Sequence, residues 1–163
     1  MKKILLLGAS GLIGGGVYER LDQVPGIEVI RHSRSPRAGY KACEIGSPAF
    51  AELVDESDCI VNCTGIGLSR LGAAGETNKG LTEQILAAIK PSAAGKKPLF
   101  HLSSVKAHNP EQRVDAYADD KYAAEQVIHL NCAMLSDHTV TYNDLVGEVY
   151  ARLQPVGHVR TSP

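Results

Sequence analysis

The sequence predicts a single α/β domain, a doubly wound parallel sheet of about six strands with helices on both faces. Three observations predict this fold class. Short, continuous apolar runs, such as residues 4–7, fit strands that are buried on both faces. These runs alternate with segments whose apolar residues recur at helical spacing, as right-handed βαβ units require. The length of 163 residues suits one domain.

The first predicted unit is a strand, a glycine turn and a helix. Residues 4–7 form the strand and residues 8–14 form the turn. The apolar side chains of the helix recur at helical spacing: Ile13, Val17 and Leu21. Pro and Gly at 25–26 end this helix.

A second and a third strand are expected at Ile27–Ser33 and 40–45, on either side of a loop rich in Arg, Ser and Pro. Ser and Pro at 47–48 are typical of a helix start, because Ser caps the helix and Pro fits its first position. This helix is predicted to run to about residue 54. The fourth strand, residues 58–63, again contains a continuous apolar stretch.

Residues 76–90 are predicted to form a helix and residues 99–103 a fifth strand, in which His101 is expected to be a core residue with its hydrogen bonds satisfied. The polar segment 104–115 contains Pro110 and is predicted to be a loop. A strong helix follows at Ala116–Asn131. Four of its residues are expected to face inward: Tyr122, Ala123, Val127 and Leu130.

The last predicted elements are a strand at 138–142 and a helix at 143–153, where Asn and Asp offer an N-cap. Residues 1–153 then form one domain, and residues 154–163 form a C-terminal tail.

The composition excludes several classes of protein. A net charge of −1 provides no basic field for nucleic acid or an anionic membrane. No apolar run approaches the roughly 18 residues of a membrane span, and a signal peptide is not expected. The four cysteines form no CxxC pair, which favours reduced thiols in a cytoplasmic protein. No pair of the six histidines has metal-ligand spacing with a carboxylate, so no metal is predicted.

The glycine turn indicates nucleotide binding. A turn of this kind between a buried strand and a helix presents backbone N–H groups at the helix N-terminus to a pyrophosphate. The predicted cofactor-binding residues of the turn are Gly8, Ser10, Gly11, Leu12, Ile13 and Gly14. The alternative is a structural strand–helix turn, since glycine also marks ordinary turns.

Ser33 and Arg34 stand about 20 residues after the turn, where an NAD-binding protein carries an acidic residue. Ser33 cannot repel a 2′-phosphate, and Arg34 can pair with one, so the sequence favours NADP over NAD. The alternative is a solvated basic loop.

The ends of two other strands provide further candidates, because the ligand crevice of an open parallel sheet lies beyond the carboxyl ends of its strands. Glu44 and Ile45 are expected to flank the adenine. Cys63, Thr64 and Gly65 are expected to let the backbone pass close to the adenosine and pyrophosphate. The alternative for either segment is simple sheet packing.

Tyr117 and Lys121 are four residues apart and therefore share a helix face. A neighbouring Lys and an oxidised nicotinamide, both positive, would lower the pKa of the phenol and make it a useful acid/base. Ser103 and Ser104 end the fifth predicted strand and could supply a hydroxyl that holds a substrate carbonyl or alcohol. The alternative is that the Tyr and Lys are surface residues without a role in catalysis.

Together these segments resemble the short-chain dehydrogenase/reductase superfamily, and most closely its extended, sugar-nucleotide epimerase/dehydratase-like branch. The resemblance spans about residues 3–130. Five segments carry it: the Gly8-x-x-Gly11-x-x-Gly14 turn, 62–65, 78–86, 102–106 and 117–125. It implies a Rossmann fold, with residues 1–153 as the NAD(P)-binding domain, and NADP or NAD as cofactor.

The resemblance also implies roles for individual residues. Tyr117 would be the catalytic acid/base, and Lys121 would bind the nicotinamide ribose and lower the pKa of Tyr117. Ser104, or less favourably Ser103, would orient the substrate. Asn78 belongs to the third matching segment and is counted with the cofactor-binding residues.

Departures from the family pattern lead to two hypotheses. Ser104 and Tyr117 are 13 residues apart, a tighter spacing than extended members usually show, and relatives carry a substantial C-terminal substrate-binding region that is not expected here. The first hypothesis is an oxidoreductase or epimerase/dehydratase that transfers hydride to or from a small carbonyl, alcohol or sugar-nucleotide substrate. The second is a dinucleotide-binding module with little activity of its own, either a sensor or a half-domain that a partner completes. Oligomers are common in the superfamily, so a homo-oligomer is also expected.

Overall fold

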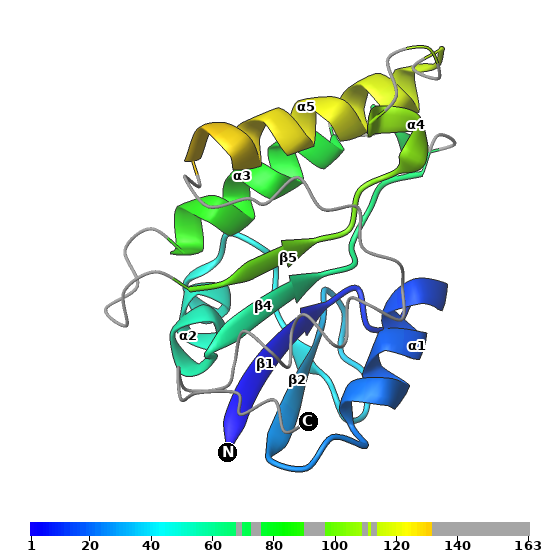
Figure 1. The fold of residues 1–163 in the computed structure, drawn as a ribbon. Coiled ribbons are helices and arrows are strands. Elements are labelled where there is room, and N and C mark those ends of the chain that lie inside the picture. Colours follow the sequence, from blue (N-terminus) through cyan, green and yellow to red (C-terminus); the bar gives the residue numbers. More distant parts are fainter. Residues whose placement is uncertain (68–69, 73–75, 90–96, 109–110, 112–113, 132–163) are drawn as a thin grey trace, which may run out of the picture.

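The computed structural model describes residues 1–67, 70–72, 76–89, 97–108, 111 and 114–131. Within these ranges five parallel strands form one sheet in the order β3-β2-β1-β4-β5 (Figure 1). The strands are β1 Lys2–Leu7, β2 Ile27–Ser33, β3 Lys41–Ala42, β4 Cys59–Asn62 and β5 Leu99–His101. The predicted α/β fold class is confirmed.

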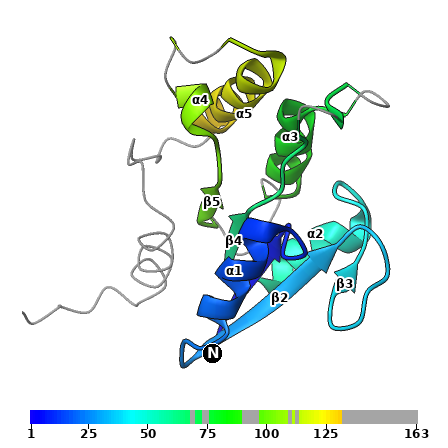
Figure 2. The same ribbon diagram turned by 90° about the vertical axis from the view of Figure 1, so that its right-hand side faces the viewer.

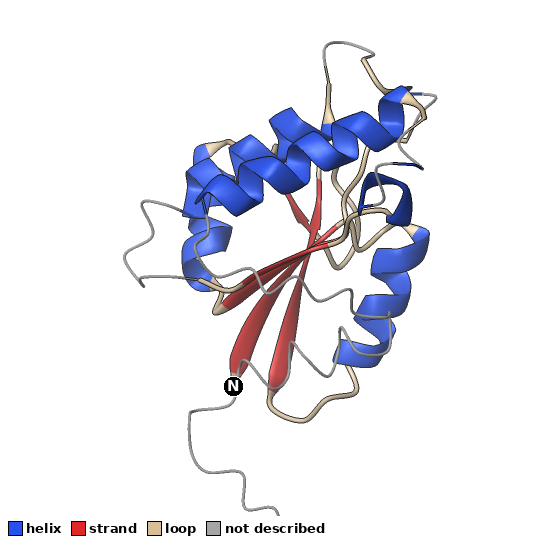
Figure 3. Ribbon diagram, turned by 45° about the horizontal axis from the view of Figure 1, so that its top comes forward, coloured by secondary structure: helices blue, strands red, loops and turns tan. Residues whose placement is uncertain are grey.

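The helices of the described ranges are α1 Leu12–Leu21, α2 Pro48–Glu56, α3 Asn78–Ile89, α4 Val105–His108 and α5 Ala116–Asn131. α1 covers one face of the sheet, whereas α2 and α3 cover the other face, so the molecule has three layers (Figures 2 and 3). α5 packs mainly against α3 and also contacts α4.

The side chains of β1 explain its continuous apolar sequence. Ile4 and Leu6 belong to the core cluster that α1 covers, and Leu5 and Leu7 belong to the cluster beneath α2 and α3. All four side chains are fully buried. Because successive strand residues point to opposite faces, a central strand covered on both sides has no position left for a polar residue.

Most predicted boundaries agree with the structure, and β2 and α5 agree to the residue. β3 is shorter than the predicted 40–45. It pairs only with β2, and the turn from Glu44 to Ser47 leads directly into α2 at Pro48. The prediction of a loop over 104–115 is wrong at its start, because residues 105–108 form α4, with the Ala107 N–H donating to the carbonyl of Ser104 at 2.9 Å.

The predicted inward face of α5 is also wrong by about one position. Tyr122, Ala123 and Val127 are half-buried, and the side chain of Leu130 lies outside the described part. The buried residues of α5 are Ala118, Lys121, Ala124 and Ile128. The face that α5 buries therefore carries two small side chains, a lysine and an isoleucine, whereas Tyr122 and Val127 lie at its edges.

The strand at 138–142, the helix at 143–153 and the tail at 154–163 lie outside the described residues. Among the described residues, no helix is long and apolar enough to cross a membrane.

The order of the strands places a crevice beside β1. From β1 the chain proceeds to β2 and β3 on one side and later to β4 and β5 on the other. At such a reversal the connections leave in opposite directions, so the carboxyl ends of β1 and β4 border an open crevice.

Candidate functional site

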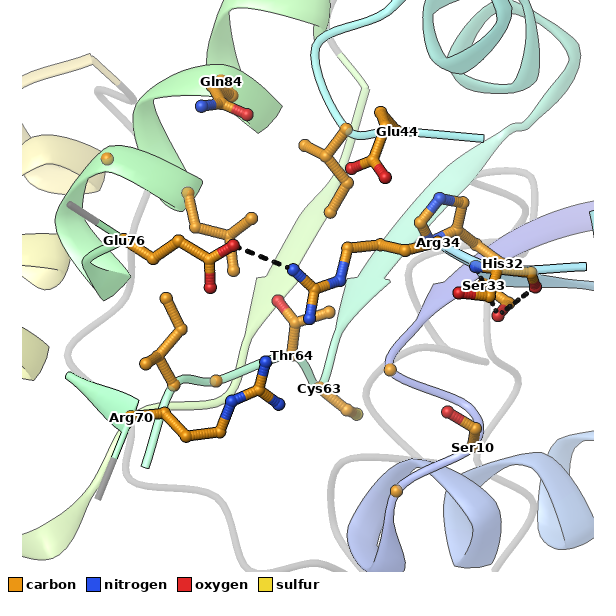
Figure 4. Close-up of a pocket in the computed structure, with 18 of the residues that line it drawn as sticks. Ser10, His32, Ser33, Arg34, Glu44, Cys63, Thr64, Arg70, Glu76 and Gln84 are labelled. Atoms are coloured by element: carbon orange, nitrogen blue, oxygen red, sulfur yellow. Dashed lines mark hydrogen bonds and ion pairs between the residues drawn. The ribbon is translucent and has the colours of Figure 1, made fainter. Parts of the chain in front are cut away.

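A cavity of about 810 Å³ lies at the carboxyl ends of β1, β2 and β4, with the start of α3 at its other side (Figure 4). This volume is within the range of small-molecule sites. Ten of the predicted cofactor-binding residues line it: Gly8, Ser10, Gly11, Ser33, Arg34, Glu44, Ile45, Cys63, Thr64 and Gly65. Six do not line it: Leu12, Ile13, Gly14, Asn78, Ser103 and Lys121.

The glycine turn is built so closely that two of its positions cannot carry a side chain. A Cβ at Gly14 would lie 2.1 Å from the carbonyl oxygen of Gly8. Gly8 itself has a φ of +76°, and its Cβ would lie 2.8 Å from the backbone carbon of Cys63. The turn therefore holds β1, α1 and the end of β4 in contact through backbone atoms alone.

The N-terminus of α1 is left open by this turn. Its N-cap is Gly11, which has no side-chain oxygen to accept from the first turn of the helix. The Gly11 N–H donates to the Gly8 carbonyl at 2.9 Å, which closes the turn beneath the helix. Leu12 and Ile13 are exposed at the first positions of α1. Open backbone N–H groups and the positive end of the helix dipole make this a favourable position for an anion.

Arg34 extends across the cavity from the end of β2. Its Nη1 lies 3.1 Å from Oε1 of Glu76, which precedes α3 (Figure 4). Both residues line the cavity and both side chains are nearly half-exposed. Arg70 lines the same cavity and carries a second guanidinium. Ser33 is oriented locally, since its hydroxyl donates to the carbonyl of Ser35 at 2.8 Å.

His32 forms part of the cavity wall in its neutral state. The side chain is buried and packs edge-on against the ring of Phe50, and burial lowers its pKa. Its Nε2 lies 2.8 Å from the carbonyl oxygen of Cys43. Because that oxygen can only accept, Nε2 carries the proton and donates. This bond ties the end of β2 to the segment that carries Glu44 and Ile45.

The end of β4 is fixed by a chain of polar side chains. The Asn62 Oδ1 accepts from the Thr64 N–H at 3.0 Å and from the Thr64 hydroxyl. The Asn62 Nδ2 donates to Nδ1 of His101 at 3.0 Å. These bonds orient Thr64, which lines the cavity, from a side chain that is itself buried.

Lys121 lies at the centre of a buried polar group on the α3/α5 side of the sheet. Its side chain is only 3% exposed, and its Nζ is 3.4 Å from the carbonyl oxygen of Leu102. Burial lowers the pKa of Lys121, while the charges of Asp120 and Glu125 raise it. A Cβ at Gly65 would lie 2.9 Å from this Nζ, so the lysine ammonium packs directly against the backbone at Gly65.

His101 corrects the prediction of a fully satisfied core residue. Its buried Nε2 has no hydrogen-bond partner among the described residues. Burial and, to a smaller extent, the charge of Lys121 together lower the pKa of His101 to about 3. Cys63 is also uncharged near pH 7, because burial raises the pKa of its thiol to about 11. Cys43, Cys59 and Cys63 are all free thiols.

Asn78 is fully engaged within the protein and does not line the cavity. Its Oδ1 accepts from the Ile66 N–H at 2.8 Å, and its Nδ2 donates to the Ile66 carbonyl at 3.0 Å. The same Nδ2 and the Asn78 backbone N–H donate to the carboxylate of Asp120 at 2.8 and 2.6 Å. Asn78 thereby joins the loop after β4 to α5.

Of the predicted catalytic residues, Tyr117 and Lys121 lie in the first turns of α5, and Ser104 directly precedes α4, which contacts α5. Asp115 caps that helix, since its Oδ1 accepts from the Ala118 N–H at 2.8 Å, and this places Tyr117 in the first turn. Tyr117 and Ser104 are half-buried. Ser103 donates its hydroxyl to the carboxylate of Glu125, so that hydroxyl already has a protein partner. Tyr117 and Ser104, like Lys121, do not line the cavity.

No group of three or more His, Cys, Asp or Glu side chains in the described ranges is arranged to hold a metal ion.

Sequence reasoning missed three charged residues of the site. Arg70 lies in a glycine-rich segment without periodicity, and Glu76 is at the start of the predicted helix 76–90. No local pattern points either side chain towards the cavity that both line. Asp120 was within the YxxxK segment, but its partner is 42 residues away, and no local pattern predicts such a contact.

Comparisons with known proteins agree with this architecture. No protein-family model and no curated protein matches the sequence. Among solved structures, UDP-N-acetylglucosamine 4-epimerase from Bacillus cereus is similar with a TM-score of 0.64 and 18% identity, over 80% of this chain and 48% of that chain. These likenesses show the fold, a parallel α/β fold that this chain shares with the similar structures.

Two further structures support this statement about the fold. A short-chain dehydrogenase/reductase superfamily protein from Agrobacterium tumefaciens with bound NAD has a TM-score of 0.62 and 20% identity, over 78% of this chain and 44% of that chain. The terminal R domain from the myxalamid PKS-NRPS biosynthetic pathway has a TM-score of 0.64 and 21% identity, over 80% of this chain and 45% of that chain. The chain thus spans about half the length of these similar structures.

Proposed function

We propose that the cavity binds a nicotinamide dinucleotide, NADP in preference to NAD, and that the protein is an oxidoreductase or epimerase/dehydratase of the short-chain type. The observation that carries the proposal is the glycine turn. Gly8 and Gly14 admit no side chain, and Gly11 leaves the N-terminus of α1 open at the wall of a cavity of about 810 Å³. This construction suits a pyrophosphate that must approach the backbone closely.

The lining residues fit the other parts of a dinucleotide. Arg34 offers a guanidinium for a 2′-phosphate, and the neighbouring Ser33 adds no negative charge. Glu44 and Ile45 would border the adenine, and the backbone of Thr64 and Gly65 would pass beside the adenosine and pyrophosphate. Similar structures include proteins with bound NAD, which supports a cofactor of this chemical class.

When bound, the nicotinamide would supply a carbon that accepts or donates a hydride. Tyr117 would then exchange a proton with the oxygen of a carbinol or carbonyl group, and Ser104 would hold that oxygen by a hydrogen bond. Lys121 would contribute its positive charge from beneath the loop at Gly65. The substrate class proposed is a small carbonyl, an alcohol or a sugar nucleotide.

One observation favours a second candidate, a dinucleotide-binding module with little activity of its own. Tyr117, Lys121 and Ser104 do not line the cavity, and Lys121 is only 3% exposed. A catalytic group must come within hydrogen-bond reach of the proton it transfers. Under this alternative the cavity binds the cofactor, and the α5 residues only stabilise the fold.

Calorimetric titration with NADP⁺ and NAD⁺, followed by turnover assays on carbonyls, alcohols and sugar nucleotides, tests both candidates. The proposal expects saturable binding, tighter for NADP⁺, and a preference that Arg34→Gln removes. Binding without turnover on any of these substrates favours the module. Absence of binding by either dinucleotide contradicts both candidates.

A further inference from the structure

We propose that Asp120 is a positioning residue that joins the dinucleotide cavity to the helix carrying Tyr117 and Lys121. This inference rests on the proposed function, because it assigns to Asp120 the alignment of the two halves of that site. Asp120 itself does not line the cavity. It acts through Asn78 on one side and through Lys121 on the other.

Asp120 first holds the N-terminus of α3 by hydrogen bonds. Its Oδ2 accepts from the backbone N–H of Asn78 at 2.6 Å and from Nδ2 of the same residue at 2.8 Å. Its Oδ1 accepts from the backbone N–H of Lys79 at 3.3 Å. A carboxylate from α5 thus satisfies open N–H groups of α3 and lies at the positive end of that helix.

The second step passes from Asn78 to the wall of the cavity. With Nδ2 fixed by Asp120, the amide of Asn78 is oriented so that Oδ1 faces the Ile66 N–H at 2.8 Å and Nδ2 also reaches the Ile66 carbonyl at 3.0 Å. Ile66 and its neighbour Gly65 line the cavity. Asn78 is 2% exposed, so this clamp works in a site shielded from water. Removing Asp120 would free the amide of Asn78 to rotate and would loosen the loop after β4.

The third step concerns the charge of Lys121, the residue that follows Asp120. Titratable groups from three elements face this ammonium: Asp120 and Glu125 of α5, Cys63 after β4, and His101 of β5. His101 and Cys63 are neutral near pH 7, since burial keeps the pKa of one low and that of the other high. Asp120 and Glu125 are therefore the carboxylates that oppose the burial of this charge. Glu125 is also the acceptor for the Ser103 hydroxyl.

The chemistry of the contact requires a carboxylate. Three N–H donors converge on Asp120, and two carboxylate oxygens can accept all of them. An amide in this place has one acceptor oxygen and brings an NH₂ group against at least one of the donors. Asp119 provides a matched comparison, because it is the exposed neighbour on the same helix turn and carries the same charge.

The test compares Asp120→Asn, Asp120→Glu and Asp119→Asn with the wild-type chain by two measurements. The first is NADP⁺ affinity by calorimetry, and the second is the pH titration of the Lys121 side chain by NMR, which needs no ligand. Asp120→Asn should weaken NADP⁺ binding about tenfold, as expected for the loss of a hydrogen bond to a charged group. It should also move the Lys121 midpoint to lower pH, whereas Asp119→Asn should change neither quantity. Asp120→Glu keeps the charge and should leave the Lys121 midpoint close to that of the wild type.

Equal affinities and equal Lys121 midpoints in Asp120→Asn and Asp119→Asn would overturn the proposal. The same shift of affinity or of the Lys121 midpoint in both variants would also overturn it. The loss of one negative charge, wherever it lies on α5, would then explain the result. If Asp120→Asn does not fold, Asp120→Glu provides the test. That variant keeps the negative charge, so a Lys121 titration midpoint that differs from the wild type would contradict a role for the charge. Failure of the wild type to bind either dinucleotide would refute the proposed function, while the ligand-free titration would still test Asp120.

Discussion

The cavity and the buried group around Lys121 lie on either side of the loop after β4. They differ in solvent exposure and in the kind of contact that shapes them. The cavity is open, and its charged side chains, such as Arg34 and Glu76, are nearly half-exposed. The group beneath the loop places Lys121, Asn62 and Asn78 at 3% exposure or less. The cavity is shaped by backbone contacts that exclude side chains, whereas the buried group is shaped by hydrogen bonds between side chains.

Under the proposed function, this difference predicts a division of labour between binding and chemistry. The glycine turn shapes the cavity beside α1. The buried group would position the α5 residues, and it reaches the cavity wall through Asn78 and Ile66. The following substitutions test that division, beginning with the largest expected effect.

Tyr117→Phe should lower turnover strongly and leave cofactor binding in the cavity nearly unchanged. Loss of the phenolic proton donor is expected to lower turnover by about 100- to 10,000-fold, the usual contribution of a general acid/base. NADP⁺ affinity should stay within about twofold, because Tyr117 does not line the cavity. Steady-state kinetics and calorimetry on the same preparation measure both. Unchanged turnover in the variant would support the module instead of the enzyme.

Gly14→Ala should damage the cavity and leave the buried group intact. Its Cβ would lie 2.1 Å from the Gly8 carbonyl oxygen, so the turn must shift, at a cost of roughly 3 kcal/mol in the free energy of unfolding. Dinucleotide binding should be lost with it. Gly15→Ala is the control, since its nearest atom outside its own helix is the Ala9 oxygen at 3.7 Å. Equal urea midpoints for the two variants would contradict this reading of the turn.

His101→Gln should make the protein less sensitive to acid. Burial lowers the pKa of His101 from 6.5 to about 3, so the unfolded chain binds one more proton between these values. Stability due to this group is present above pH 6.5 and decreases as the pH falls, by about 1.4 kcal/mol per pH unit. Urea unfolding at pH 6.5 and pH 5 should show a smaller loss, by about 2 kcal/mol, in the variant than in the wild type. His32 contributes in the same direction in both proteins and cancels in the difference.

Glu76→Gln should have the smallest effect, confined to the cavity. The carboxylate of Glu76 competes with a ligand phosphate for Arg34. Since an exposed ion pair contributes at most about 1 kcal/mol, its removal should raise the affinity for NADP⁺ by about two- to fivefold and change NAD⁺ binding little. Glu83→Gln, which loses an exposed contact with Lys79 on α3, is the matched control. An equal gain for both dinucleotides would show that Arg34 does not distinguish them.

The sequence could predict the features that depend on local patterns, but not the contacts between residues far apart in the chain. The glycine turn, β2 and α5 follow from patterns within a few residues, and ten predicted residues meet at the cavity because parallel strands end at one edge. The predicted inward face of α5 was wrong because the helix buries Ala118 and Ala124, which side-chain size alone does not indicate. The links from Asp120 to Asn78, and from Arg34 to Glu76, join residues 42 apart and depend on tertiary packing that no local pattern encodes.

A crystal structure of the protein with NADP⁺ tests the central claim most directly. We expect the adenosine in the cavity between the ends of β2 and β4, the 2′-phosphate on Arg34 in place of Glu76, and the pyrophosphate at the N–H groups of Leu12 and Ile13. Saturating NADP⁺ that leaves the cavity empty, or that binds elsewhere while the Arg34–Glu76 pair stays intact, would contradict the account.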